Sequence, residues 1–122
     1  MQPLDMQDKM RIVQELVPGR QITLAHIIAN PDPILYQKLG LDPSLDYKRA
    51  AIGVLTISPA ETAVITADIA LTTSGAELGF VDRFSGTLII TGTVAEVEAS
   101  FQAIADYFSN VLKFTVCEVT RT

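Results

Sequence analysis

Residues 76–92 read AELGFVDRFSGTLIITG, and the rest of the chain can be organised around them. Two apolar runs, AELGFV (76–81) and TLIITG (87–92), flank the residues DRFSG (82–86). Two such runs joined by a short polar segment that contains glycine predict a β-hairpin. A turn needs only glycine and small polar residues. An acid, a base and an aromatic ring in succession therefore raise the question of what this hairpin tip faces.

The segment after the hairpin predicts a long amphipathic helix and a closing strand. Thr93 and Glu96 have the spacing of a capping box, in which two side chains satisfy free amide groups at the start of a helix. FTVCEVT (114–120) predicts a strand. Between them, apolar residues recur every three or four positions, which is the period of one helical face. These residues are Val94, Val97, Phe101, Ile104, Phe108 and Val111.

The segment before the hairpin predicts a strand and then a second helix. AAIGVLTI (50–57) is an apolar, β-branched run typical of a strand. Ser58, Pro59 and Glu61 follow it, and this combination predicts a helix capped by Ser58 with Glu61 completing a capping box. We expect that helix to run to about Thr73.

The order of elements over residues 50–120 is therefore βαββαβ. It predicts an α+β fold with a ferredoxin-like core, in which helices pack on one face of a mostly antiparallel sheet. A further strand, QITLAHIIA (21–29), and a short helix, ILYQKLG (34–40), precede this core. No composition shift marks a boundary, so we expect residues 21–122 to form a single domain.

The N-terminal residues predict a tail, a short segment of open type and a turn. Residues 1–10 are polar and predict a flexible tail. RIVQELV (11–17) is short and fits either an edge strand or a helical turn. Pro18 followed by Gly19 predicts a type II turn that leads into the strand at Gln21.

The composition argues against several classes of protein. The chain has 122 residues, a net charge of −5 and a pI near 4.6, which disfavours a nucleic-acid binder. Its mean hydropathy is +0.32, yet no apolar run reaches the roughly 18 residues that span a membrane. The apolar excess fits burial between subunits or a well-filled core. The first ten residues lack the apolar segment of a signal peptide, and the single cysteine fits a reducing cytosol.

Few residues are suited to catalysis or metal binding. His26 is the only histidine and lies in an apolar strand, where a structural hydrogen-bonding role is more common than ligation. Cys117 also lies in a strand pattern and predicts a buried structural thiol. Asp68 interrupts an apolar helix and is a candidate for a buried carboxylate, although a structural role is favoured. No P-loop, dinucleotide-binding or hydrolase motif is present, so nothing argues for an enzyme, a cofactor or a metal site.

The sequence resembles the circularly permuted bacterial microcompartment (BMC) shell proteins of the ethanolamine- and propanediol-utilisation type. The combination of VPGRQ with TLAH and of GFVDRFSG is specific to that group, and the matching stretches cover nearly all of the chain from residue 11 onward. They are QELVPGRQITLAHIIANP (14–31), LGL (39–41), AIGVLTISPAETAVITADIA (51–70), LGFVDRFSG (78–86) and FTVCEVTRT (114–122).

The resemblance implies a structural protein without catalytic activity or cofactor. Family members form cyclic hexamers that tile, with other shell proteins, into a shell around metabolic enzymes in the bacterial cytoplasm. It implies a permuted BMC domain over residues 21–122, preceded by a strand (11–20) that forms a small axial β-barrel with its five copies. The segment that would cap the axis consists of Ile12, Val13, Gln14, Glu15, Leu16 and Val17.

The resemblance also answers the opening question, because in the family this hairpin tip approaches the sixfold axis. The residues concerned here are Asp82, Arg83, Phe84, Ser85 and Gly86. Asp82 beside Arg83 would leave the collar near neutral, Phe84 would pack on a neighbouring loop, and Gly86 would permit close backbone approach. One position departs from the family, since Thr72 stands where many shell proteins carry a lysine at the hexamer edge.

Two other functions remain open from the fold pattern alone. A small ferredoxin-like regulatory domain would bind a ligand at a dimer or trimer interface, and a small enzyme could use the same fold. Both require a pocket with convergent polar groups, whereas a shell subunit requires a hexameric disc.

Overall fold

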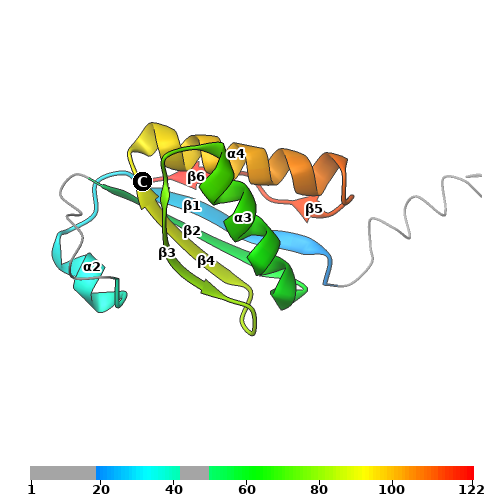
Figure 1. The fold of residues 1–122 in the computed structure, drawn as a ribbon, viewed down its shortest axis with the longest axis horizontal. Coiled ribbons are helices and arrows are strands. Elements are labelled where there is room, and N and C mark those ends of the chain that lie inside the picture. Colours follow the sequence, from blue (N-terminus) through cyan, green and yellow to red (C-terminus); the bar gives the residue numbers. More distant parts are fainter. Residues whose placement is uncertain (1–18, 42–49) are drawn as a thin grey trace, which may run out of the picture.

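The computed structural model describes residues 19–41 and 50–122 and shows one sheet with helices packed against it (Figure 1). The predicted flexible tail and the segment 12–17 lie outside the described residues. The α+β fold predicted from the sequence is confirmed, and so is the hairpin over residues 76–92.

Within the described residues, six strands form the sheet, in the order β3-β4-β2-β1-β5, with β6 also paired to β1. The strands are β1 (Gln21–Ile28), β2 (Ala51–Ser58), β3 (Glu77–Asp82), β4 (Thr87–Gly92), β5 (Thr115–Val116) and β6 (Thr120–Arg121). The pairs β1–β2, β2–β4 and β3–β4 are antiparallel, whereas β5 and β6 run parallel to β1. The first strand of the described chain therefore lies between the core strand β2 and the C-terminal strands.

The helices of the part of the chain that the structure describes are α2 (Ile34–Lys38), α3 (Ala63–Thr73) and α4 (Val94–Asn110), and a 3₁₀ turn (Ala60–Thr62) precedes α3. α3 and α4 cover the same face of the sheet, and α2 lies apart from them at one end (Figure 1). The predicted capping box of α4 is present, because Thr93 Oγ1 accepts from the Glu96 amide and the Glu96 carboxylate accepts from the Thr93 amide. Gly40 follows α2 with φ +72°, a conformation that glycine adopts readily and that commonly ends a helix.

The main core fills the space between the sheet and the two long helices. Gly53 on β2 lets α4 approach closely, since a Cβ there would lie 2.6 Å from Val97 Cγ1 and 2.8 Å from Phe101 Cζ. The buried side chains of this cluster include Ile22, Ala25, Ile27, Leu55, Ile57, Ala67, Leu88, Ile90, Val97, Phe101, Ile104 and Phe108.

A second, smaller cluster lies on the opposite face of the sheet. It consists of Tyr36, Leu41, Ile52 and Ile89. Because successive residues of a strand point to opposite faces, Ile52 and Ile89 face away from the main core that their sequence neighbours enter. Tyr36 comes from α2, and burial raises the pKa of its hydroxyl. The short helix thus has its own apolar partners.

The predicted start of the second helix is wrong. Ser58 pairs with Gln21 at the end of the β1–β2 ladder, so it belongs to β2 and caps no helix. Pro59 has an extended backbone, and neither the 3₁₀ turn nor α3 has a side-chain cap. Ser58 fits both a strand end and a helix cap in the sequence, and in the structure it takes the strand position.

The predicted strand 114–120 and the predicted helical face also need correction. β5 and β6 pair with β1 in one common register, but the ladder is interrupted opposite a bulge in β1 between Ile22 and Leu24. Two short strands result instead of one. Val111 is 59% exposed and follows the last helical residue, Asn110, so the buried stripe of α4 ends at Phe108.

Candidate assembly site at the hairpin tip

Asp82 organises the hairpin tip from within the chain. It ends β3 and pairs with Thr87, the first residue of β4. Its carboxylate accepts hydrogen bonds from the Phe84 amide and the Ser85 hydroxyl, each at 2.8 Å. The Phe84 amide and then the Ser85 hydroxyl stabilise the charged form, which holds the pKa of Asp82 below its ordinary value. The acid in the motif therefore has a local role, which is to fix the shape of the loop.

Gly86 anchors the tip to the end of β2. Its amide donates to the Asp82 carbonyl at 2.9 Å, and its carbonyl accepts from the Ile57 amide at 2.8 Å. Its φ is +75°, and a Cβ at this position would collide with the Ile57 carbonyl oxygen. Glycine is thus required by the chain's own packing. Unlike its neighbours in the motif, Gly86 is buried.

Arg83 and Phe84 point outward. The Phe84 side chain is 81% exposed, the largest value among the exposed apolar residues described. The guanidinium carbon of Arg83 lies 5.0 Å from the centroid of the Phe84 ring, a cation–π arrangement. Within residues 19–41 and 50–122, no carboxylate lies within ion-pair distance of Arg83. The tip therefore presents an aromatic ring and a cation that the chain leaves accessible.

A hollow of about 270 Å³ lies between the tip and the first turn of α3. Its lining residues are Val64, Val81, Asp82, Arg83 and Phe84. Sequence reasoning identified the three tip residues of this group but missed Val64. That residue stands about twenty positions earlier in the chain, and only the packing of α3 beside the hairpin brings it to the tip.

The outer face of α3 continues the apolar surface away from the tip. Val64, Ile65 and Leu71 are 53%, 40% and 43% exposed. Asp68 lies on this exposed face, so the interpretation of Asp68 as a buried carboxylate is wrong. Thr72 is also exposed, and its hydroxyl donates to the Asp68 carbonyl at 2.9 Å.

The remaining candidate residues have structural surroundings. His26 Nδ1 lies 2.6 Å from Thr120 Oγ1, and its Nε2 lies 2.9 Å from Thr122 Oγ1, so the ring holds the C-terminal strand to β1. This confirms the structural interpretation of His26. Cys117 is half-buried against the main core. Among the described residues, no group of three His, Cys, Asp or Glu side chains could hold a metal ion, and no helix is long and apolar enough to cross a membrane.

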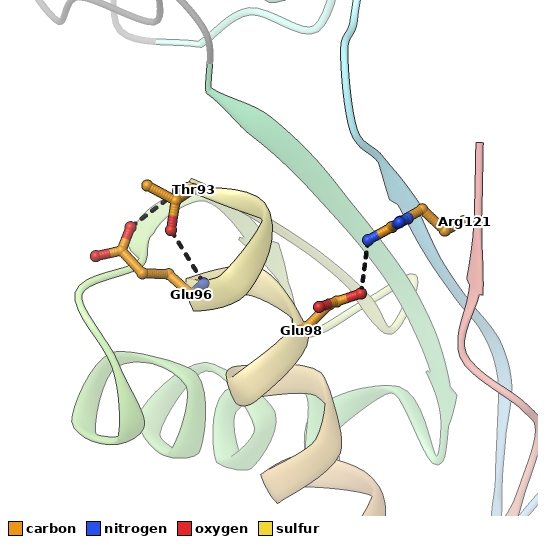
Figure 2. A network of polar contacts seen from close by, with 4 residues as sticks. All are labelled: Thr93, Glu96, Glu98 and Arg121. Atoms are coloured by element: carbon orange, nitrogen blue, oxygen red, sulfur yellow. Dashed lines mark hydrogen bonds and ion pairs between the residues drawn. The ribbon is translucent and has the colours of Figure 1, made fainter.

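Polar contacts at the far end of the molecule fix the start of α4 and tie β6 to it (Figure 2). The Thr93 amide donates to Glu96 Oε1 at 2.8 Å, and the Glu96 amide donates to Thr93 Oγ1 at 3.1 Å. Arg121 Nη1 pairs with Glu98 Oε2 at 2.9 Å, with both side chains about half exposed. These contacts join elements of the scaffold and take no part in the hairpin tip.

Comparisons with known proteins place this scaffold in one family. The model of the BMC domain matches residues 51–120. The shell protein PduU of Salmonella typhimurium is 45% identical over 112 residues, which cover 92% of this chain and 93% of the relative. The shell protein EutS of Escherichia coli is 44% identical over 115 residues, covering 94% and 99%.

Solved structures agree with the sequence relatives. A structure titled CutR flat hexamer superposes with a TM-score of 0.78 at 44% identity and covers 88% of this chain and 95% of that chain. A structure titled CutR Screw gives a TM-score of 0.76 at 43% identity, covering 86% and 100%. A fused permuted hexameric shell protein shares the fold at 21% identity, with a TM-score of 0.66 over 75% of this chain and 47% of that chain.

The position of β1 agrees with a permuted arrangement. This strand precedes the segment that the BMC model matches, yet it completes the same sheet between β2 and the C-terminal strands. The chain therefore belongs to the BMC domain family and is a permuted bacterial microcompartment shell protein of the PduU, EutS and CutR type.

Proposed function

We propose that this chain forms cyclic homohexamers that tile, with other shell proteins, into a shell around metabolic enzymes in the bacterial cytoplasm. The observation that carries the proposal is the similarity to the CutR flat hexamer, which extends over nearly the whole of both chains. The role is structural, as it is in the relatives that are described as shell proteins.

The surface of the subunit supports assembly into a ring. The fully buried residues of α3 are small, Ala63, Thr66, Ala67 and Ala70, and Ile69 packs partly against the core, whereas Val64, Ile65 and Leu71 face outward. Leaving large apolar side chains in water forfeits the free energy that their burial would contribute, roughly 1.5–3 kcal/mol for each one fully buried. Packing these side chains against a neighbouring subunit would provide part of that free energy.

We place the hairpin tip, Asp82 to Gly86, at the axis of this ring. The support is the outward orientation of Arg83 and Phe84, together with the short intrachain hydrogen bonds that hold the loop in one shape. A loop near a symmetry axis appears once in every subunit, so six copies would form a collar.

The segment from Ile12 to Val17 is proposed as an axial cap. Its apolar residues need partners that an isolated strand cannot supply, and a closed barrel of six copies would satisfy both strand edges. Deletion of residues 1–17 is expected to leave a folded hexamer with an open axis in a cryo-EM map. A monomeric or unfolded product would mean that the segment is part of the core assembly.

Native mass spectrometry tests the ring itself. We expect one main species at six times the subunit mass of 13.2 kDa. Negative-stain images should show discs and, at higher concentration, sheets. A protein that remains a monomer, dimer or trimer at micromolar concentrations would contradict the proposal.

A second form of assembly follows from the CutR relatives, whose structures are titled both flat hexamer and screw. We propose that subunits of this chain can also assemble into an open helix, in which neighbouring subunits use the same contact as in the ring. Head-to-tail contacts give a ring when the rotation between subunits closes and a helical filament when it does not.

A further inference from the structure

The VPGRQ motif (17–21) joins the N-terminal segment to β1, and the structure describes it from Gly19 onward. Gly19 has φ +82°, and a Cβ there would meet no atom within 4 Å. Its backbone conformation, and not a lack of space, therefore calls for glycine. The chain turns at this residue and enters β1 at Gln21, with Arg20 between the two.

Arg20 contacts the connection between α4 and β5 in three ways. Its carbonyl accepts a hydrogen bond from the Thr115 amide at 3.2 Å. Its Nη2 donates to the Leu112 carbonyl at 2.8 Å, two residues beyond the end of α4. Its guanidinium carbon lies 5.3 Å from the centroid of the Phe114 ring. These three contacts are called the Arg20 clamp below.

The surface that receives Arg20 is fixed to the main core. Phe114 is 8% exposed, its amide donates to the Phe108 carbonyl at 2.8 Å, and the centroids of the two rings lie 4.9 Å apart, edge to face. The Leu112 carbonyl follows the C-terminal end of α4, where the backbone carries partial negative charge and a cation is favoured. A side chain held at this place has a defined position relative to the sheet.

The exposure of Arg20 indicates that the clamp contributes little to the stability of the subunit itself. Substitutions of exposed side chains usually have small effects on unfolding. The three contacts instead restrict the direction of the backbone next to a glycine turn, which has wide conformational freedom. That restriction matters for assembly, because strands from six subunits close a barrel only when each leaves its subunit in the same direction.

Resting on the proposed axial cap, we infer that Arg20 is the positioning residue of the N-terminal segment. The clamp holds the chain where it enters β1, so the segments of all six subunits start in one orientation. Part of the entropic cost of closing the cap is thereby removed before the copies meet. The clamp acts within one subunit and is no contact of the ring, so its loss should open the cap and leave the hexamer intact.

Cleavage by a glutamate-specific protease tests the clamp in the assembled protein. Glu15 lies in the proposed cap, and Glu77 lies on β3, at the other end of the strand order from β5. Arg20→Ala should raise the rate of cleavage after Glu15 by about fivefold or more, because this rate follows the population of the open segment. Cleavage after Glu77 requires opening of the sheet and should stay unchanged. Native mass spectrometry should still show the hexamer.

Matched variants separate the clamp from general effects of charge. Arg121→Ala is the control, because Arg121 is an exposed arginine whose side chain pairs with Glu98, and it should leave cleavage after Glu15 unchanged. Arg20→Lys keeps the charge but lacks the planar group that stacks on Phe114, so its effect should lie between wild type and Arg20→Ala. Phe114→Leu removes the ring, and its effect combined with Arg20→Ala should be less than additive.

The outcomes distinguish the clamp from the assembly on which it rests. A wild-type protein that never forms hexamers would overturn the proposed function and the clamp together. Wild-type hexamers cleaved after Glu15 as fast as a free peptide of residues 1–20 would overturn the axial cap, and the clamp with it. Equal protection of Glu15 in wild type and Arg20→Ala would overturn the clamp alone. So would a rise by the same factor after Glu15 and Glu77, since Arg20 would then support the fold instead of the direction of the segment.

Discussion

The two long helices lie on the same face of the sheet but distribute their apolar residues in opposite ways (Figure 1). α4 buries large apolar side chains, among them Phe101, Ile104 and Phe108, and Ser100 is the one polar residue buried with them. α3 buries alanine and threonine and exposes Val64, Ile65 and Leu71. In a monomer the large apolar residues of a helix normally face inward. The comparison shows that α4 serves the subunit's own core, whereas α3 leaves an apolar surface exposed, which the proposed ring would cover with a neighbouring subunit.

The largest expected effect tests whether α4 carries the stability of the subunit. Phe101→Ala removes a ring that is 1% exposed and should lower the free energy of unfolding by about 3–5 kcal/mol. Leu71→Ala on the outer face of α3 should change subunit stability by only about 0.5 kcal/mol while weakening assembly. Urea unfolding at two protein concentrations separates the two contributions. Equal losses of subunit stability would remove the distinction between the helices.

The next effect concerns the contact between the helices. Ser100 on α4 is fully buried, and its hydroxyl donates to the Ala70 carbonyl at 3.0 Å and lies 2.9 Å from the Ser74 hydroxyl. Ser100→Ala deprives these groups of their partner and should cost about 1–3 kcal/mol. Ser109→Ala, an exposed position on the same helix, serves as the control and should be nearly neutral. The measurement is again urea unfolding, and a neutral Ser100→Ala would mean that the bridge contributes nothing.

A smaller difference is expected at the helix starts. Thr93→Ala removes the side-chain acceptor of the α4 capping box and should destabilise the protein by about 1 kcal/mol. Thr62 occupies the same position before α3, but its side chain makes no cap hydrogen bond there. Thr62→Ala should therefore cost less, as thermal unfolding of the two variants would show. A larger loss from Thr62→Ala would reverse the comparison.

The smallest effect concerns acid sensitivity at the tip. The pKa of Asp82 is lowered from 3.8 in the folded protein, so its carboxylate stabilises the fold above about pH 4. This contribution is lost as the pH falls through the lowered pKa, because the protonated acid is a poorer acceptor for the Phe84 amide. Asp82→Asn should flatten the dependence of stability on pH in that window. NMR titration of the Asp82 carboxyl checks the direction, and an unchanged or raised pKa would contradict it.

Local patterns were enough to predict the elements whose residues contact mainly one another. The apolar period of α4, the capping box of Thr93 and Glu96, and the hairpin around the tip are all present in the structure. Each depends on residues within a few positions, so no distant part of the chain competes with them. Val111 is the exception, because the spacing of apolar residues does not show where the buried face of a helix ends.

Predictions that depended on distant partners were the ones that failed. Ser58 has the sequence of a helix cap, but its pairing with Gln21 makes it part of the sheet. Residues 114–120 have the sequence of one strand, but a bulge in β1 interrupts the ladder that they join. Both outcomes were decided by β1, which is remote in the chain from either segment.

The sequence by itself determined the α+β class, the hairpin, the main helix and the resemblance to the shell family. It also determined that Asp82, Arg83 and Phe84 stand together at one tip. Only the tertiary structure decided that Asp82 turns inward to the loop while Arg83 and Phe84 turn outward beside Val64. Neighbours in the chain share a location, but the direction of each side chain follows from the hydrogen bonds and contacts available there. That difference separates the acid that shapes the loop from the two residues that the loop leaves exposed.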